Sequence, residues 1–305
     1  MKEEPLAMSG TPVSKILFMG LGASGKSSIR SIVFEGKSLD DVKDYNATIN
    51  YTRSTRNIID SAFQIFDCGG QESFISVFVG EQAEFIFSNV SILVWVADVS
   101  NFDAVSTSKF YFDHAVNRLH QYSPDAVIYC LFHKIDLLLL DMREQVIETM
   151  ESFFTTDKDI KIVYRGTSIY DQSTFSVVGE MVQTLITKSI KAQTVSEAIQ
   201  EFVKQNTELS GIAIYSEDGL PVFEEGDLAN KIILPANLWL TNYERLRGDF
   251  PGNSFKTTLE TNDYMFVFQQ IKTEILLAGI ARKVSPLQYV LVKMDKLAEI
   301  VSDLL

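Results

Sequence analysis

The sequence predicts an α/β protein: a doubly wound, mostly parallel sheet over residues 13–191, followed by a smaller α+β domain over residues 192–305. Up to about residue 191, short apolar runs alternate with longer amphipathic stretches, a pattern typical of a parallel sheet with crossover helices. Two of these runs are apolar at successive positions, as in strands that are covered on both faces. Beyond this point, short strands separated by tight turns predict an antiparallel unit. Residues 1–12 show no periodicity and are expected to form a flexible tail.

In the first domain, each apolar run predicts a strand and each amphipathic stretch predicts a helix. The strands are expected at Lys15–Met19, Phe63–Phe66, Ile92–Ala97, Val127–Phe132 and Lys161–Arg165. The clearest helical patterns lie at Lys26–Phe34, Tyr111–Gln121 and Asp141–Phe154. This alternation predicts that the strand ends meet at one edge of the sheet, where ligands of such folds bind.

The second domain is expected to follow the order αββαβββα. A capping-box pattern at Thr194–Glu197 predicts a helix that runs to about Lys204. The expected strands are Ile212–Tyr215, Pro221–Phe223, Ser254–Glu260, Tyr264–Ile271 and Ile275–Ala281, with a helix at about 227–246 between the second and third. The last helix is predicted to begin with Pro286 in its first turn, where proline is tolerated.

Charge and cysteine content narrow the classes of function. The 27 Lys and Arg residues against 40 Asp and Glu residues give a net charge of −13, which opposes direct binding to nucleic acid or to anionic lipid. Cys68 and Cys130 lie inside apolar runs, which excludes a disulfide scaffold and favours a reducing compartment. We see no signal peptide, membrane span or lipidation signal. We therefore expect a cytoplasmic protein unless another chain tethers it.

A glycine-rich loop follows the first strand and precedes the first helix. Residues 20–27 match the pattern G-x-x-x-x-G-K-[ST] in this strand–loop–helix context. Backbone N–H groups of such a loop surround phosphate, the lysine contacts the β- and γ-oxygens, and the hydroxyl serves Mg²⁺. We expect nucleotide contacts from these loop and helix residues: Gly20, Gly22, Ala23, Ser24, Gly25, Lys26, Ser27 and Ser28.

Asp67 ends the second predicted strand and is followed by Cys-Gly-Gly-Gln. A carboxylate at this place can hold Mg²⁺ through water. Gly70 can bring its N–H close to a γ-phosphate because it has no Cβ. Gln71 is an uncharged donor and acceptor suited to orienting an attacking water.

The sequence His133-Lys134-Ile135-Asp136 follows the strand Val127–Phe132 and predicts the choice of base. A fixed carboxylate at Asp136 can accept hydrogen bonds from both the ring N–H and the exocyclic amine of guanine, a pair that adenine lacks. Lys134 can lay its methylene groups on the base. Together with the two preceding motifs, this pattern favours guanine nucleotides.

These motifs resemble those of the Ras-superfamily GTPases, and among them the Rag/Gtr branch. The branch has His-Lys-x-Asp at the guanine loop, Asp-Cys-Gly-Gly-Gln as at 67–71, and Ser-Pro-Asp-Ala as at 123–126. The resemblance implies a P-loop GTPase domain at 13–191 and a roadblock/longin-like dimerisation domain at 192–305. It covers nearly the whole chain, but only the first 190 residues carry specific motifs.

The resemblance also implies roles for individual residues. Thr48 would be the switch threonine, whose hydroxyl reaches Mg²⁺ together with Ser27 and, through water, Asp67; from its neighbours alone, Thr48 only opens a β-rich segment. Ser168 and the backbone N–H of Ile169 would contact guanine. Gln71, Lys26 and Thr48 form the expected catalytic set, with GTP or GDP and Mg²⁺ as cofactors.

We expect slow hydrolysis. GTPases that are faster without an activator carry an arginine just before the switch threonine, worth roughly 10³–10⁵ in rate, whereas residues 44–47 here are Asp-Tyr-Asn-Ala. Arg53 and Arg56 follow Thr48 and are expected on a solvent face.

The expected partners come from the resemblance. They are a second Rag/Gtr-like chain, bound through residues 192–305 as a homo- or heterodimer, a roadblock-type scaffold, and activating and exchange proteins. Mixed features leave open whether the chain pairs with itself, and the implied output is nutrient signalling, with membrane contact only through the scaffold. The alternatives are a P-loop small-molecule kinase, which equal binding of ATP and GTP would favour, and a scaffold protein with a degenerate GTPase half.

Overall fold

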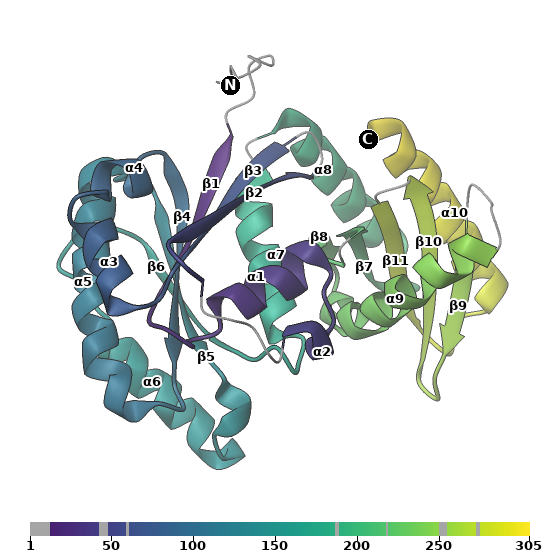
Figure 1. Ribbon diagram of the computed structural model, residues 1–305. Coiled ribbons are helices and arrows are strands. Elements are labelled where there is room, and N and C mark those ends of the chain that lie inside the picture. The colour runs from purple at the N-terminus through teal and green to yellow at the C-terminus, as the bar shows by residue number, and fades with distance from the viewer. Residues whose placement is uncertain are drawn as a thin grey trace.

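A computed structural model of the chain describes residues 13–42, 48–58, 61–186, 189–217, 219–249, 255–272 and 275–305. The predicted tail, residues 1–12, lies outside this part, as do residues 44–47 just before Thr48. Figure 1 shows two sheets side by side, with helix α7 (Ser173–Ile186) between them; helix α8 (Ile190–Gln205) follows and leads to the second sheet. Within the described ranges, no helix is long and apolar enough to cross a membrane.

The first sheet has the strand order β2-β3-β1-β4-β5-β6. Its strands are β1 (Ser14–Met19), β2 (Tyr51–Ile58), β3 (Ser61–Cys68), β4 (Val90–Asp98), β5 (Val127–His133) and β6 (Ile162–Thr167). All neighbouring pairs are parallel except β2 and β3, which are antiparallel. The predicted doubly wound, mostly parallel sheet is therefore confirmed, and the β-rich segment after Thr48 is the antiparallel edge strand.

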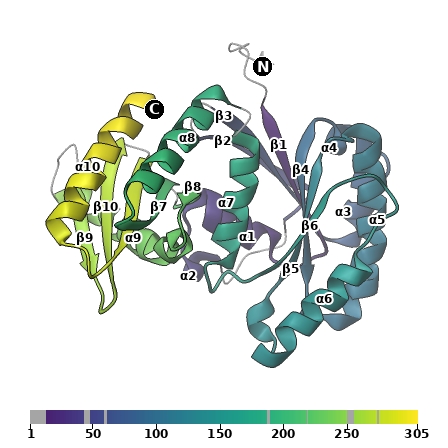
Figure 2. The same cartoon turned by 180° about the vertical axis from the view of Figure 1, so that it is seen from behind.

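Side chains alternate along the central strands and build one core on each face of this sheet. On β1, Ile16 and Phe18 belong to one buried cluster, and Leu17 and Met19 belong to the other. Helix α1 (Lys26–Glu35) and α7 cover the first face, next to the second sheet. The opposite face is covered by α3 (Glu72–Val79), α4 (Ala83–Phe87), α5 (Val105–Tyr122) and α6 (Arg143–Phe153), as Figure 2 shows from behind.

The strand register brings the predicted site residues to one edge of the sheet. Asp67 on β3 lies opposite Phe18, directly before the glycine-rich loop. Asp98, His133 and Thr167 are register partners at the carboxyl ends of β4, β5 and β6. Because parallel strands end at the same edge, motifs far apart in the sequence converge here.

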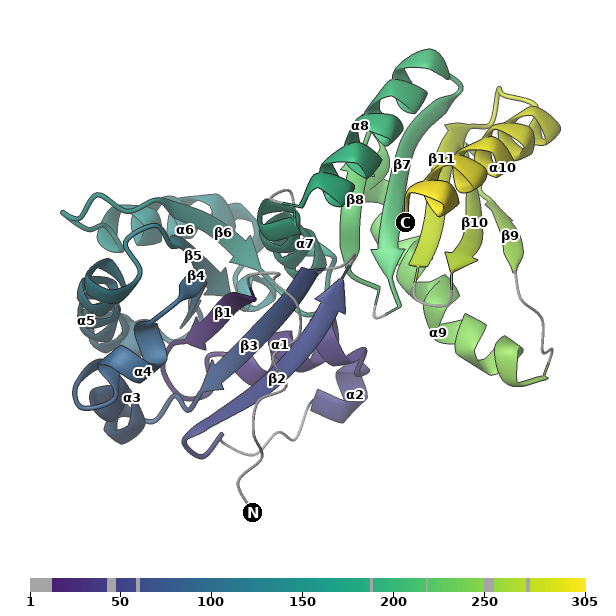
Figure 3. The same cartoon turned by 90° about the horizontal axis from the view of Figure 1, so that it is seen from above.

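The second sheet is antiparallel, with the order β8-β7-β11-β10-β9. Its strands are β7 (Leu209–Ser216), β8 (Pro221–Glu225), β9 (Lys256–Glu260), β10 (Tyr264–Lys272) and β11 (Ile275–Arg282). In Figure 3, α8 and α10 (Leu287–Leu304) lie over one face, and α9 (Ile233–Asp249) lies against the other. With α8 included, the elements follow the order αββαβββα.

Three predicted helix starts in this domain are wrong. The helix expected from about residue 227 begins at Ile233, after a 3₁₀ turn at Ala229–Ile232. Helix α8 begins at Ile190 with Ser189 as its N-cap, so Thr194 is an interior residue whose hydroxyl donates to the carbonyl of Ile190, four residues earlier. The capping-box pattern is coincidental, because a threonine can satisfy its hydroxyl inside a helix in this way. Pro286 is the N-cap of α10 with extended backbone, one position before the helix begins. The predicted domain boundary at 191/192 falls inside α8.

The two sheets share one buried cluster through α7. Val178 and Val182 on α7 belong to the same core as Ile214 and Val222 of the second sheet. Gly179 permits this contact, since a Cβ there would lie 2.6 Å from Cγ and 2.8 Å from the carbonyl oxygen of Pro221. The glycine thus lets strand β8 approach the helix backbone.

Candidate functional site

The glycine-rich loop joins β1 to α1 through an unusual backbone conformation. Ala23 and Gly25 have φ of 61° and 102°, in the left-handed region, and Gly25 is the N-cap of α1. A Cβ at Gly25 would collide with the ring of His133, and one at Gly20 would collide with the carbonyl of Val96. This alternation of backbone conformation is the kind that turns N–H groups toward an anion, directly at a helix N-terminus.

Lys26 is almost fully buried at the start of α1, with 5% of its surface exposed. Its Nζ donates to the carbonyl of Leu21 at 2.7 Å, so the ammonium group lies inside the curve of the loop. Burial lowers the pKa of Lys26 to about 8, and the carboxylate of Asp67 opposes that shift. A buried cation in this position is stabilised by an anionic ligand, and it stabilises that ligand in turn.

Asp67 lies beneath the loop and is fully buried. Neither carboxylate oxygen has a hydrogen-bond partner among the described residues. Burial raises the pKa of Asp67, while Ser27, Lys26 and Arg30 oppose the shift. A buried carboxylate with one ion pair, to Arg30 Nε at 3.4 Å, still has oxygen lone pairs for a further donor or a metal-bound water.

The hydroxyl group of Ser27 interacts with this carboxylate and is in turn linked to the hydroxyl group of Thr48. Ser27 Oγ and Thr48 Oγ1 share a hydrogen bond of 2.8 Å, although they come from α1 and from the segment before β2. The three predicted metal-site residues thus supply only oxygen atoms, the donor type that Mg²⁺ prefers. The residues present fit a magnesium ion.

The turn after Asp67 packs tightly against the segment that carries Thr48. Gly69 donates its N–H to the carbonyl of Asn50 at 2.6 Å, and a Cβ on Gly69 would lie 2.6 Å from the Thr48 carbonyl. A Cβ on Gly70 would collide with Lys26 Nζ. Gln71 is the N-cap of α3 and keeps its side chain exposed at the rim. The glycine pair thus brings this turn close to the loop lysine.

His133 begins the loop His133–Asp136, here called the base loop, and connects it to Thr167 on β6 and to Gly25 in the glycine-rich loop. Its Nδ1 shares a hydrogen bond of 3.0 Å with the hydroxyl of Thr167 at the end of β6, and its ring faces Gly25. Burial lowers the pKa of His133 to about 4, and Lys134 adds to this shift. The imidazole is therefore neutral at physiological pH and acts as a packed spacer between the phosphate loop and the base loop.

Lys134 connects the base loop to the glycine-rich loop of residues 20–27 (the phosphate loop) by a hydrogen bond. Its backbone is left-handed, with φ of 66°, and its Nζ donates to the carbonyl of Ala23 at 2.8 Å and to Asp98 at 2.6 Å. Burial would raise the pKa of Asp98, but hydrogen bonds from Lys134 and Ser100 outweigh it and lower the pKa. The lysine stem is thereby held across the mouth of the site.

A cavity of about 380 Å³ collects most of the predicted residues. From the prediction, it is lined by Gly22, Ala23, Gly25, Lys26, Ser27, Ser28, Thr48, Gly70, Gln71, His133, Lys134, Asp136 and Ile169. The other predicted residues, Gly20, Ser24, Asp67 and Ser168, are absent from this lining. Ser168 is buried, and its Oγ accepts from the N–H of Tyr170 at 3.0 Å, which shapes the turn beside the base loop.

Comparison with known protein families agrees with this geometry. The family model described as the Gtr1/RagA G protein conserved region matches residues 15–220. The chain belongs to the Gtr1/RagA family. The match covers the first sheet from Lys15 on, the whole cavity and strand β7. The predicted P-loop GTPase fold is confirmed.

Two yeast members of the Gtr1/RagA family show how far the likeness extends. The chain is 34% identical over 192 residues to "GTP-binding protein gtr1" of Schizosaccharomyces pombe, covering 62% of this chain and 61% of that protein. It is 35% identical over 184 residues to "GTP-binding protein GTR1" of Saccharomyces cerevisiae, covering 59% of each. The chain thus spans about 60% of the length of these relatives.

A solved structure, the Arl6 BBS3 small GTPase from Trypanosoma brucei, is similar at 19% identity with a TM-score of 0.43. It covers 55% of this chain and 96% of that one.

The structure adds residues to the site of this Gtr1/RagA member that sequence reasoning missed. Leu39 and Val42 on α2 (Leu39–Val42) also line the cavity, as do Leu137 next to Asp136 and Tyr170 next to Ile169. Asp98 anchors Lys134 from the end of β4. Asp98 ends strand β4, which lies next to the strand that ends at His133, and this position could have identified Asp98 as a site residue from the sequence. The apolar residues carry no such signal, since only tertiary packing brings them to the cavity.

Proposed function

We propose that this chain is a guanine-nucleotide switch that binds GTP and GDP with Mg²⁺ and hydrolyses GTP slowly. The observation that carries the proposal is the convergence of Lys26, Thr48 and Asp136 on one cavity. Lys26 would contact the β- and γ-phosphates, with the loop N–H groups around them. Asp136 would accept from the two N–H groups of guanine that adenine does not present.

A bound Mg²⁺ would supply positive charge that offsets the charge of the phosphates. Ser27 and Thr48 would hold it through their hydroxyl groups, and Asp67 would hold it through water. Gln71, exposed at the rim beside Gly70, would orient the attacking water. Lys26 would stabilise the charge on the phosphate oxygens during cleavage.

Hydrolysis by the isolated chain is expected to be slow because its described cavity lining contains no arginine. Arg53 lies exposed on β2 with its guanidinium 5.5 Å from the Phe66 ring. Arg56 is partly buried and lines a separate cavity between β2 and the second sheet, which differs from the solvent face expected from sequence. Residues 44–47 contain no arginine. A turnover below about 10⁻² per second is therefore expected without an activating partner.

The second domain is proposed to be a roadblock/longin-like unit that pairs with a second Rag/Gtr-like chain. Edge strand β8 is covered by α7, whereas β9 forms the other edge and all of its residues are exposed. Leu234 and Leu238 on α9 are 61% and 58% exposed. An exposed edge strand and, separately, exposed apolar side chains on a helix are both surfaces that association would cover.

By the same resemblance, we propose a cytoplasmic chain that reaches an endomembrane surface through a roadblock-type scaffold. Its nucleotide state would be controlled by activating and exchange proteins and reported to effectors in nutrient signalling.

One preparation tests the nucleotide proposal. The purified chain should carry bound GDP or GTP. After this nucleotide is removed, titration with GDP and with ADP in the presence of Mg²⁺ should show that GDP binds at least about 100-fold more tightly. Equal affinity for the two would support a small-molecule kinase. Failure to bind either nucleotide would support a scaffold with a degenerate GTPase half.

Sedimentation of the same preparation tests the pairing. A dimer that Leu238→Glu converts to a monomer, with unchanged GDP binding, is the expected result. A monomer at tens of micromolar, with no co-purifying relative, would contradict it.

A further inference from the structure

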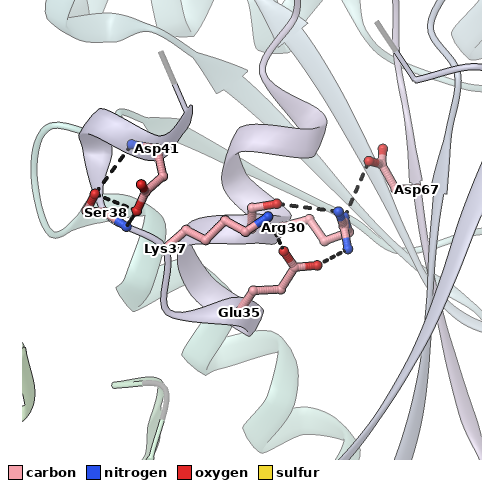
Figure 4. A network of polar contacts seen from close by, with 7 residues as sticks. Arg30, Glu35, Lys37, Ser38, Asp41 and Asp67 are labelled. Atoms are coloured by element: carbon pink, nitrogen blue, oxygen red, sulfur yellow. Dashed lines mark hydrogen bonds and ion pairs between the residues drawn. The ribbon is translucent and has the colours of Figure 1, made fainter. Parts of the chain in front are cut away.

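Arg30 lies on α1 one helical turn after Lys26, on the side that faces β3. Its Nε is 3.4 Å from Oδ2 of Asp67, and only 14% of its side chain is exposed. Figure 4 shows the guanidinium between Asp67 on one side and Glu35 on the other. Arg30 is absent from the lining of the nucleotide cavity, so it approaches Asp67 from behind the site.

Glu35 holds the other end of the guanidinium. Its carboxylate is in contact with Nη1 of Arg30 and accepts from Lys37 Nζ at 2.9 Å. Burial would raise the pKa of Glu35, but Lys37 and Arg30 outweigh it and lower the pKa. Arg30 also donates from Nη2 to the hydroxyl of Ser31 at 3.4 Å. The guanidinium is therefore fixed by two residues of its own helix and is not free to swing away from β3.

The contact with Asp67 has an unusual form. Among the residues that the structure describes, Arg30 Nε is buried and makes no hydrogen bond of normal geometry, and neither do the Asp67 oxygens. At 3.4 Å the two groups attract each other by charge, and the contact is longer than a strong charge-assisted hydrogen bond. Lys26, the other nearby cation, donates to the phosphate loop.

We propose that Arg30 is a positioning residue for Asp67, held in place by Glu35, and that it orients the carboxylate toward the water shell of the magnesium ion. This inference rests on the proposed function. A carboxylate that contacts metal-bound water is effective only if its own surroundings fix it. Arg30 supplies that support from helix α1, one turn after Lys26, which lines the cavity.

A purely structural role gives a different expectation. If the Arg30–Glu35 pair only ties down the end of α1, its loss lowers stability and leaves the response to magnesium unchanged. The release rate of GDP as a function of free Mg²⁺ separates the two roles, because it reports the metal site without any hydrolysis.

The experiment measures release of a fluorescent GDP analogue from the full chain across a series of free Mg²⁺ concentrations. In Arg30→Gln, the Mg²⁺ concentration that half-maximally slows release should rise about tenfold or more, the usual cost of losing an outer-shell partner. Release in EDTA should match the unsubstituted chain. The matched control is Arg165→Gln, which breaks an exposed pair with Glu180 of 3.0 Å and should change nothing.

A second variant tests the role of Glu35. Glu35→Gln should shift the Mg²⁺ response in the same direction by a smaller factor, and it should add nothing in the Arg30→Gln background, since both act through one contact. Should Arg30→Gln fail to fold, Glu35→Gln carries the same test with Arg30 still present.

Two results would overturn the inference while the proposed function stands: an unshifted Mg²⁺ response in a folded variant, or faster release in EDTA by the same factor as in Mg²⁺. If the unsubstituted chain holds no guanine nucleotide at any Mg²⁺ concentration, the proposed function itself fails.

Discussion

The hydroxyl groups of Ser27 and Thr48 lie 2.8 Å apart, although 21 residues separate them in the sequence. One begins the helix after the phosphate loop, and the other precedes the antiparallel edge strand β2. The tight contact of Gly69 with Thr48 and Asn50 holds the second segment in this place. Ser27, Thr48 and Asp67 come from three separate segments, so only the folded chain brings these oxygen atoms together.

Removing one of these hydroxyls should weaken the magnesium dependence of GTP binding. Thr48→Val keeps the shape of the side chain and removes the oxygen, so the gain in GTP affinity on adding Mg²⁺ should fall at least about tenfold. Calorimetric titration with and without Mg²⁺ measures this gain. Thr55→Val, at an exposed position of β2 whose register partner is Gln64, is the control. An undiminished gain in Thr48→Val would remove this residue from the metal site.

Exchanging the carboxylate of Asp136 should change which base is bound. In Asp136→Asn, an amide N–H faces the guanine amine, so GDP affinity should drop about 10- to 100-fold. Xanthosine diphosphate has a carbonyl at that position and should bind the variant more tightly than it binds the unsubstituted chain. Competition against labelled GDP measures both. Equal losses for the two bases would indicate a folding defect, and no loss for GDP would contradict the assignment.

His133 should make the stability of the chain depend on pH. Its folded-state pKa is about 4 against an ordinary 6.5, so below pH 6.5 the unfolded chain binds a proton that the folded chain does not. Stabilisation by the neutral ring is complete above pH 6.5 and is lost progressively as pH falls toward 4, by up to about 3 kcal/mol. Urea unfolding at pH 7, 6 and 5 should show a smaller pH dependence in His133→Asn. Parallel pH profiles for the two proteins would be inconsistent with a buried neutral imidazole.

Gly179 should be intolerant of substitution although it lies within a helix. Alanine favours a helix by about 1 kcal/mol relative to glycine, but its Cβ would meet Pro221 atoms at 2.6 and 2.8 Å. We expect Gly179→Ala to destabilise the chain by about 1–3 kcal/mol. Thermal unfolding tests this, with Thr184→Ala at an exposed position of α7 as the control. A stabilised Gly179→Ala protein would show that α7 and β8 are not in close contact.

Local patterns predicted most of the first domain because each parallel strand is a short apolar run and each motif sits at a strand end. Strand β4, predicted at Ile92–Ala97, extends over Val90–Asp98, and the helix predicted at Tyr111–Gln121 begins earlier, at Val105. The errors lie where local signals are ambiguous. A threonine three residues before a glutamate resembles a cap, yet Thr194 is inside α8 because the helix continues from the first domain into the second.

The sequence alone predicted the chemistry of the motifs. The phosphate loop, the turn after Asp67 and the aspartate expected to select guanine each require particular residue types within a few positions. Which side chains support that chemistry from elsewhere was decided only by folding. Arg30 behind Asp67, Asp98 beneath Lys134 and Thr167 beside His133 are contacts between separate elements of the chain. Such contacts depend on the register of parallel strands and on helix packing against them, which is a long-range property that short stretches of sequence do not encode.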